Sequence, residues 1–131
     1  GRRLLTHVRD VMRADARVPS VPDSATIADA LLEMSRKGMG MTTIVDAGGK
    51  VVGIYTDGDL RRTLEQETDI KRTCIATVMT ARPRTIGPDK MAAEAIALME
   101  SCKTFVLPVV NDDGLLVGAL SMHDLFNARI I

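Results

Sequence analysis

The sequence has 131 residues with 17 basic and 17 acidic side chains, and 46% of its residues are hydrophobic but only 2% are aromatic. A chain of this length can bury roughly two-thirds of the surface that its unfolded form exposes, so a substantial core is possible. The balanced charge argues against a nucleic-acid-binding protein, which usually carries a basic surface, and the shortage of aromatic residues removes the stacking surfaces that single strands need.

Membrane and secretion signals are missing from the sequence. No apolar run approaches the ~20 residues of a membrane span, and no signal-peptide pattern opens the chain. The two cysteines, Cys74 and Cys102, lie in no metal-binding or CxxC spacing. Reduced thiols are therefore favoured over a disulfide. We expect a cytoplasmic protein with no membrane partner and no metal site.

The first forty residues predict a helical turn, an edge strand and a helix. The turn is expected over residues 8–13 and the strand over 18–21, at the edge of a sheet because a proline cannot occupy a central strand. Four apolar residues then recur on one helical face: Ile27, Ala30, Leu31 and Met34. Thr26 and Asp29 predict a capping box at the start of this helix, and Gly38 predicts its end.

A hairpin and a further helix are expected next. Residues 42–46 and 51–55 predict two strands joined by a glycine-containing turn. The following segment, 57–67, predicts a helix with Leu60 and Leu64 facing inward.

The second half of the chain repeats this order. A short strand is expected over 84–86, two longer strands over 106–110 and 115–120, and a last helix from residue 122. Its first helix shows an apolar face whose four residues each lie 65 positions beyond their counterparts: Ala92, Ala95, Ile96 and Met99. A pattern that matches at so many points indicates an internal duplication.

The most specific repeated feature is the junction between the last strand and the last helix of each half. Both junctions consist of a glycine, two apolar residues, a hydroxyl residue, two variable residues and then Asp-Leu. The hydroxyl and acidic residues are Thr56 and Asp59 in the first half and Ser121 and Asp124 in the second. Each junction therefore places a hydroxyl and a carboxylate beside the free N–H groups of a helix start.

This order of β-α-β-β-α, closing with Gly-apolar-apolar-Thr/Ser-x-x-Asp, resembles the CBS motif, and two copies resemble a CBS pair. The resemblance covers about Val8 to Arg129. It implies an α/β fold of two CBS motifs packed as an intertwined, pseudo-twofold pair, each with a small mixed sheet and helices on one face. The implied boundaries are a linker from a missing domain over 1–7, a first motif over 8–72 and a second over 73–131.

Five further stretches make the resemblance more specific. They are similar to stretches in the C-terminal half of bacterial arabinose-5-phosphate isomerases: Gly1-Arg2-Arg3-Leu4-Leu5, Val8-Arg9-Asp10-Val11-Met12, Gly40-Met41-Thr42, Thr56-Asp57-Gly58-Asp59-Leu60-Arg61-Arg62 and Met122-His123-Asp124-Leu125. Those enzymes join a sugar-isomerase (SIS) domain to a CBS pair and convert ribulose 5-phosphate to arabinose 5-phosphate, the first step towards Kdo and lipopolysaccharide. The resemblance implies a regulatory part without the catalyst, which is no enzyme on its own.

The resemblance also implies partners. One is the protein's own SIS domain, and another is a second copy, giving a homodimer or higher homo-oligomer. We expect the helix faces to form that contact, because an alanine-rich stripe permits close approach. The residues of this stripe are Ala92, Ala93, Ala95 and Ala97.

The two hydroxyl–Asp pairs allow two interpretations. A carboxylate can accept two hydrogen bonds from the vicinal diol of a ribose, and a helix start can meet a phosphate. Alternatively, Thr56 and Asp59, like Ser121 and Asp124, form capping boxes that only stabilise their helices. The CBS resemblance favours binding for at least one of the two pairs.

Five other residues complete the predicted ligand site. Arg61 is placed near a helix start, where a cation opposes the helix dipole unless an anion is bound. His123 replaces Gly58 in the second copy and could hydrogen-bond a phosphate. Met41 and Thr42 start a central strand, where CBS pairs line the cleft between motifs, and a buried hydroxyl on Thr42 needs a partner.

The inventory of catalytic residues is poor, since the sequence contains no phosphate-binding glycine loop and no nucleophile motif. We therefore expect ligand sensing with no required cofactor. The candidate ligand is CMP-Kdo, as a feedback signal, or an adenine nucleotide. The alternative is a structural module that binds no ligand and only holds the enzyme's oligomer together.

Overall fold

A computed structural model describes residues 5–131, so the first four residues of the expected linker lie outside the described part. The described residues form two compact units. The continuous unit consists of Pro19–Pro83, and the split unit consists of the described residues up to Val18 together with Arg84–Ile131.

The continuous unit contains a four-stranded sheet in the order β1-β2-β3-β4. Its strands are β1 (Ser20–Pro22), β2 (Met41–Val45), β3 (Val51–Thr56) and β4 (Thr80–Ala81). β1 runs parallel to β2, whereas the β2–β3 hairpin and the β3–β4 pair are antiparallel. The expected hairpin is confirmed, and an edge strand is present, although it spans Ser20–Pro22 where residues 18–21 were expected, so its proline is Pro22 and Pro19 lies just before it.

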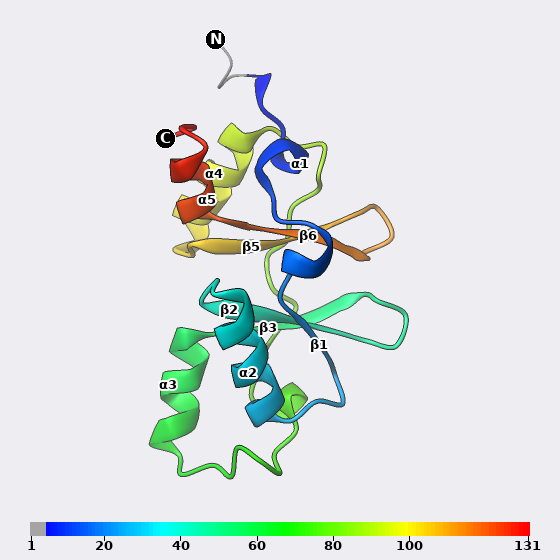
Figure 1. Cartoon of the computed structure of the whole chain (residues 1–131), viewed down its shortest axis with the longest axis vertical. Helices are drawn as coiled ribbons and strands as arrows, with labels where there is room; N and C mark the ends of the chain where they lie inside the picture. Colours follow the sequence, from blue (N-terminus) through cyan, green and yellow to red (C-terminus); the bar gives the residue numbers. More distant parts are fainter. Residues whose placement is uncertain (1–4) are drawn as a thin grey trace. The chain divides into compact units, whose positions relative to one another are not determined.

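Two helices lie on the same side of this sheet, α2 (Ile27–Lys37) and α3 (Asp57–Glu65) (Figure 1). The capping box of α2 is confirmed: the Thr26 N–H donates to Asp29 Oδ2 at 3.0 Å, and the Asp29 N–H donates to Thr26 Oγ1 at 3.2 Å. The helix ends at Gly38, whose φ of 65° suits a residue without a Cβ.

The prediction that Leu64 faces inward is wrong, because this side chain is 63% exposed. The buried residues of α3 are Asp59 and Thr63. Thr63 Oγ1 donates to the Asp59 carbonyl at 3.0 Å, so the Tyr55 hydroxyl, 2.7 Å away, donates to Thr63. Burial raises the pKa of Tyr55, which keeps that phenol a donor. These bonds turn the polar face of α3 towards β3 and leave Leu64 outside.

Glu33 on α2 is a buried acid, 8% exposed. It accepts hydrogen bonds from Lys37 Nζ at 2.8 Å and from the Ser20 N–H at 3.0 Å. Burial by itself raises the pKa of Glu33, but these two hydrogen bonds and the charges of Lys37 and Arg36 together hold the pKa below its ordinary value. The carboxylate therefore ties α2 to the start of β1 in its charged form.

We expect Glu33→Gln to lower the free energy of unfolding by about 1–2 kcal/mol at neutral pH, because a charged hydrogen-bond acceptor is lost. The folded-state pKa lies below the unfolded value, so this stabilisation is present above the unfolded pKa and disappears as pH falls through the folded pKa. Urea unfolding of both proteins at neutral and acidic pH measures the difference. Glu65→Gln, at an exposed acid, is the control, and a pH-independent difference would contradict the assignment.

The split unit contains a two-stranded antiparallel sheet of β5 (Val106–Val110) and β6 (Leu116–Ser121). The expected strand over 84–86 is wrong in extent. Only Ile86 joins the sheet, through a single parallel bridge to Val109. On the opposite edge, Arg13 forms a single bridge with Ala119, and this bridge is antiparallel. The sheet is therefore extended on both sides by single residues.

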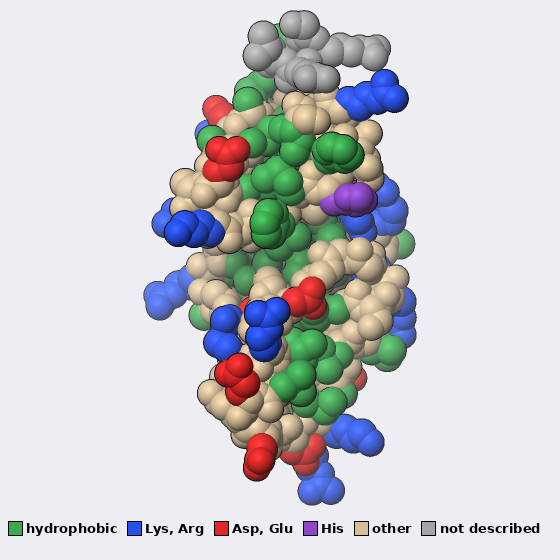
Figure 2. Space-filling view, turned by 90° about the vertical axis from the view of Figure 1, so that its left-hand side faces the viewer, with side chains coloured by type: hydrophobic (Ala, Val, Ile, Leu, Met, Phe, Trp, Pro, Cys, Tyr) green, Lys and Arg blue, Asp and Glu red, His purple; other side chains and the backbone are tan. Residues whose placement is uncertain are grey.

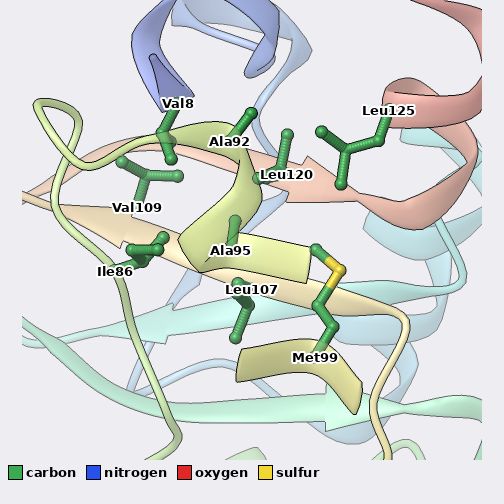
Figure 3. Packing of buried hydrophobic residues seen from close by; sticks show 9 residues of the cluster. All are labelled: Val8, Ile86, Ala92, Ala95, Met99, Leu107, Val109, Leu120 and Leu125. Carbon is green, nitrogen blue, oxygen red and sulfur yellow. The ribbon is translucent and has the colours of Figure 1, made fainter. Parts of the chain in front are cut away.

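The helices of the split unit are α1 (Val8–Val11), α4 (Ala92–Cys102) and α5 (Met122–Asn127), with a short 3-10 helix, η2, at Asp15–Arg17. Nine buried residues from these elements and the sheet form its core, shown in Figure 3: Val8, Ile86, Ala92, Ala95, Met99, Leu107, Val109, Leu120 and Leu125. The expected alanine stripe is therefore corrected. Ala92 and Ala95 are buried in this core, and only Ala93 and Ala97 face outward.

Each unit contains the segment that opens the other repeat. Val8, which precedes the first repeat's strand, is fully buried in the core of the split unit. Ile75, from the 3-10 helix η3 (Ile75–Thr77) that opens the second repeat, is fully buried in the core of the continuous unit. The two repeats therefore exchange their opening segments.

The exchange explains the glycine in each repeated junction. A Cβ built on Gly53 would collide with the Met79 side chain, and one on Gly118 would lie 2.5 Å from Met12 Sδ and 2.9 Å from the Arg13 carbonyl oxygen. Both methionines belong to the exchanged segments. The glycine of each junction therefore marks the point where the exchanged segment crosses the strand that leads into the acidic helix, β3 in one unit and β6 in the other.

Neither a membrane span nor a metal cluster is found within residues 5–131. No helix there is long and apolar enough to cross a bilayer, and no three His, Cys, Asp or Glu side chains gather as metal ligands would. Cys74 and Cys102 are both free and partly buried.

Candidate functional site

The first hydroxyl–Asp pair forms a complete capping box at the start of α3. The Thr56 N–H donates to Asp59 Oδ2 at 2.9 Å, and the Asp59 N–H donates to Thr56 Oγ1 at 3.5 Å. These two hydrogen bonds are the ones that the helix-capping interpretation predicts. With them in place, Asp59 is only 4% exposed.

The Asp59 carboxylate is fully occupied. Its Oδ1 accepts from Arg62 Nη2 at 2.6 Å and from Thr80 Oγ1 at 2.8 Å, while Oδ2 accepts from the Thr56 N–H and from Thr56 Oγ1 at 3.1 Å. An ionised carboxylate offers about four acceptor positions. A ligand hydroxyl can therefore bind Asp59 only after one of these donors leaves.

The second pair differs in how its carboxylate is used. The Asp124 N–H donates to Ser121 Oγ at 2.9 Å, which caps α5. The carboxylate itself faces Arg13, with Nε 3.3 Å from Oδ2 and Nη2 3.4 Å from Oδ1. The side chains of Asp124 and Arg13 are 17% and 18% exposed. No other side chain or backbone group of residues 5–131 donates to the Asp124 carboxylate, so within the described part of the chain these two long contacts leave acceptor positions for a ligand.

Arg13 and Thr80 occupy equivalent places in the two units. Each pairs with the strand that leads into the acidic helix, Arg13 with Ala119 and Thr80 with Ile54. The same position therefore supplies a guanidinium to Asp124 and a hydroxyl to Asp59. The cation that pairs with Asp59 is Arg62, which lies on the same helix.

Three residues that contact the Asp59 and Asp124 carboxylates are missing from the predicted site: Arg13, Thr80 and Arg62. A signal for two of them exists in the sequence. Val11-Met12 and Val78-Met79 are separated by 67 positions, and the next residues at that separation are Arg13 and Thr80. Extending the repeat by one residue would have placed both beside the junctions.

The remaining predicted residues divide between the two units. Gly58 and Arg61 lie on α3 with the first pair, and His123 lies on α5 with the second. Arg61 and His123 are exposed, and no side-chain hydrogen bond joins either of them to another residue in the part of the chain that the structure describes.

Met41 and Thr42 are both fully buried at the start of β2. Met41 pairs with Thr56 across the hairpin, which brings it next to the first capping box. Thr42 Oγ1 donates to the Thr43 carbonyl at 3.1 Å, so the partner that its buried hydroxyl needs lies within the strand.

Two hollows flank α3. One has a volume of about 230 Å³ and reaches the first carboxylate, and it is lined by Asp59, Arg62, Thr63, Gln66, Thr77 and Val78. The other, of about 350 Å³, lies between α2 and α3 and has a more apolar lining of Leu31, Met34, Ser35, Gly40, Asp57 and Leu60.

Comparison with known proteins agrees with this architecture. Arabinose 5-phosphate isomerase KdsD of Pseudomonas aeruginosa is 46% identical over all 131 residues, and the chain spans 40% of the length of that relative. Among solved structures, CBSX2 of Arabidopsis thaliana in complex with AMP matches with a TM-score of 0.81 and 26% identity, covering 95% of this chain and 96% of that one.

A second structural neighbour binds related ligands. The CBS domain pair of the protein MJ0100, in complex with 5′-methylthioadenosine and S-adenosyl-L-methionine, matches with a TM-score of 0.81 and 26% identity, covering 95% of this chain and 99% of that one. The family model for the CBS domain matches residues 8–66 and again residues 75–130. The chain therefore belongs to the CBS domain family and carries two CBS domains.

Proposed function

We propose that this chain is the ligand-sensing regulatory part of an arabinose-5-phosphate isomerase, and that a nucleotide or nucleotide sugar binds at Ser121 and Asp124. The observation that carries the proposal is the open acceptor capacity of Asp124 beside Arg13. The 46% identity to the KdsD isomerase supports the assignment of the parent protein, and the AMP complex of a structural neighbour supports a nucleotide.

The chemistry of the second pair suits such a ligand. The two hydroxyls of a ribose donate to a carboxylate, and a guanidinium attracts a phosphate or a sugar carboxylate. Asp124 and Arg13 offer both groups within one contact. His123 is exposed on the same helix and supplies a further donor for the anionic part.

The first pair is a weaker candidate. A second ligand can bind there only if Arg62 or Thr80 releases the Asp59 carboxylate. Its predicted contacts are Thr56, Gly58, Asp59, Arg61 and Met41. The predicted contact from Thr42 requires its hydroxyl to turn away from the Thr43 carbonyl.

The proposed ligand acts on the rest of the protein. It is CMP-Kdo, a feedback signal from the pathway, or an adenine nucleotide, which the AMP and S-adenosylmethionine complexes of the neighbours support. The partner that responds is the SIS domain of the full-length enzyme. A ligand that binds one arrangement of the regulatory part better shifts the activity of the attached isomerase towards that arrangement. A homo-oligomer of the chain completes the proposal.

A thermal-shift titration with CMP-Kdo, CMP, ATP, ADP, AMP and S-adenosylmethionine tests the proposal. A ligand at 100 times its dissociation constant is expected to stabilise the protein by about 2.7 kcal/mol. Asp124→Asn keeps the Ser121 cap but removes the charged acceptor, so we expect it to weaken binding by roughly 10- to 100-fold. Asp57→Asn, at an exposed acid on α3, is the matched control and leaves binding unchanged.

Each outcome has a meaning. A shift that survives Asp124→Asn unchanged would remove the second pair from the site. No shift with any compound would favour the structural module that binds no ligand, an alternative that the complete capping box of Thr56 and Asp59 supports.

A further inference from the structure

Arg13, which meets the Asp124 carboxylate, lies at one end of a short segment that is attached to the split unit at both ends. We call this segment, residues 6–13, the strap. The Arg13 N–H donates to the Ala119 carbonyl at 2.8 Å, and the Ala119 N–H donates back to the Arg13 carbonyl at 3.0 Å. These two bonds fix the C-terminal end of the strap to β6. The strap therefore carries the guanidinium of the proposed ligand site.

The N-terminal end of the strap is attached to the residues that lead into α4. The Ala92 N–H donates to the Thr6 carbonyl at 2.8 Å, and the Val8 N–H donates to the Lys90 carbonyl, also at 2.8 Å. The Val8 side chain is fully buried in the core of the split unit, close to the start of α4 (Figure 3). The strap therefore reaches from the proposed ligand site to the place where the chain enters this unit.

The strap has little stability of its own. Its helix, α1, has four residues, whereas an isolated helix needs about 12–15 residues to be even marginally stable. Val8 is the one fully buried residue among residues 6–13, and Arg9 and Asp10 are exposed. Segments that depend on a few contacts of this kind open locally at a lower free-energy cost than the core does. The strap can therefore detach while the rest of the unit stays folded.

Attachment of the strap decides how far a domain before residue 6 can move. Among the described residues, acidic and basic side chains are interspersed over the face that Figure 2 presents, with no large area of a single sign. That face gives a neighbouring domain little electrostatic guidance, so the covalent chain is the connection that counts. The strap spans seven residues from its first anchor, Thr6, to its last, Arg13, and releasing them adds up to roughly 25 Å of reach.

We propose that the strap is the connection through which the ligand regulates the preceding domain: a ligand held by Asp124 and Arg13 keeps the strap attached, and loss of the ligand lets it detach. This inference rests on the proposed function, because it names how occupancy of that same site is transmitted. Detachment moves Arg13 away from Asp124, so the detached form lacks part of the ligand site. By linkage, the ligand lowers the ratio of detached to attached chains by the factor by which it prefers the attached form.

Amide hydrogen exchange measures detachment directly. The reporters are the amides of Val8, Arg9 and Ala92, because each of their hydrogen bonds joins the strap to residues 88–92. With AMP or CMP-Kdo at 100 times its dissociation constant, we expect their exchange to slow at least about 10-fold, and about 100-fold if the detached form binds no ligand. The Asn111 amide closes the turn between β5 and β6 and is the control in the same unit, whose exchange the ligand leaves unchanged.

A variant tests the strap without any ligand. Val8→Ala shrinks the buried anchor at one end, so a strap that opens as one piece exposes the Arg9 amide and the distant Arg13 amide together. We expect the exchange of both amides to accelerate by the same factor, at least about 10-fold. Val21→Ala, at a valine that is 7% exposed in the core of the continuous unit, is the matched control and leaves both amides unchanged.

The outcomes separate this inference from the proposed function. A ligand that raises the melting temperature but leaves the exchange of Val8, Arg9 and Ala92 unchanged overturns the strap as the connection, while the ligand site stands. Unequal factors at Arg9 and Arg13 in the Val8→Ala variant also overturn it, whether or not a ligand binds. A chain that binds none of the compounds contradicts the proposed function, and this inference with it.

Discussion

Replacing Asp59 with alanine is expected to lower the free energy of unfolding of the continuous unit by about 3 kcal/mol. The variant keeps the capping bond from its own N–H to Thr56 Oγ1, but it leaves the Thr56 N–H and the Thr80 hydroxyl without their charged acceptor, and a hydrogen bond to a charged group is worth about 1.5–3 kcal/mol. Loss of the ion pair with Arg62 adds little, because that side chain is 66% exposed and water can solvate it.

The chain offers its own probe and its own control for this measurement. Tyr55 is the only tyrosine, and its hydroxyl bonds to α3 through Thr63, so tyrosine fluorescence during urea unfolding reports on the continuous unit. Asp124→Ala changes the equivalent acid of the split unit, where the capping bond uses the Asp124 backbone and survives. We expect a smaller loss there, about 1–2 kcal/mol. Equal losses at the two positions would contradict the difference in occupancy.

The elements that periodicity predicted are the ones whose packing is local. The apolar face of α2 and that of α4 each repeat at helical spacing, and both helices lie where they were expected. The failures come from partners elsewhere in the chain. Leu64 fits the helical pattern, but the hydroxyl bonds from Tyr55 through Thr63 rotate α3 and leave Leu64 in solvent.

The candidate site was likewise predictable where its residues are close together in the sequence. The repeated junction identified both hydroxyl–Asp pairs, and it allowed both a cap and a ligand site. The distinction between the pairs depends on Arg13, which lies 111 residues from Asp124, and on Thr80, which lies 21 residues from Asp59. The junction motif itself does not contain these contacts, because Arg13 and Thr80 belong to the exchanged opening segments and follow only from extending that part of the repeat by one residue.

This exchange leads to the second large effect, which concerns where the chain can be divided. The repeats in the sequence suggest that residues 8–72 form one motif. The family model likewise matches residues 8–66, whereas the compact unit of the structure spans Pro19–Pro83, and Ile75 within that unit is fully buried. Fragments 19–83 and 8–72 have equal length, so they can be compared directly. We expect the first to fold and the second to remain largely unfolded.

The reason lies in what fragment 8–72 lacks. It loses the Ile75 side chain, and removing one such buried residue already costs about 2–5 kcal/mol. It also loses β4 and the Thr80 bond to Asp59, and it keeps Val8 without the core in which that side chain is buried. A domain of this size is stable by only about 3–10 kcal/mol in total. Circular dichroism and tyrosine fluorescence of the two fragments decide the matter: if fragment 8–72 unfolds cooperatively with the stability of fragment 19–83, the opening segments belong to their own repeats and the exchange does not stabilise the protein.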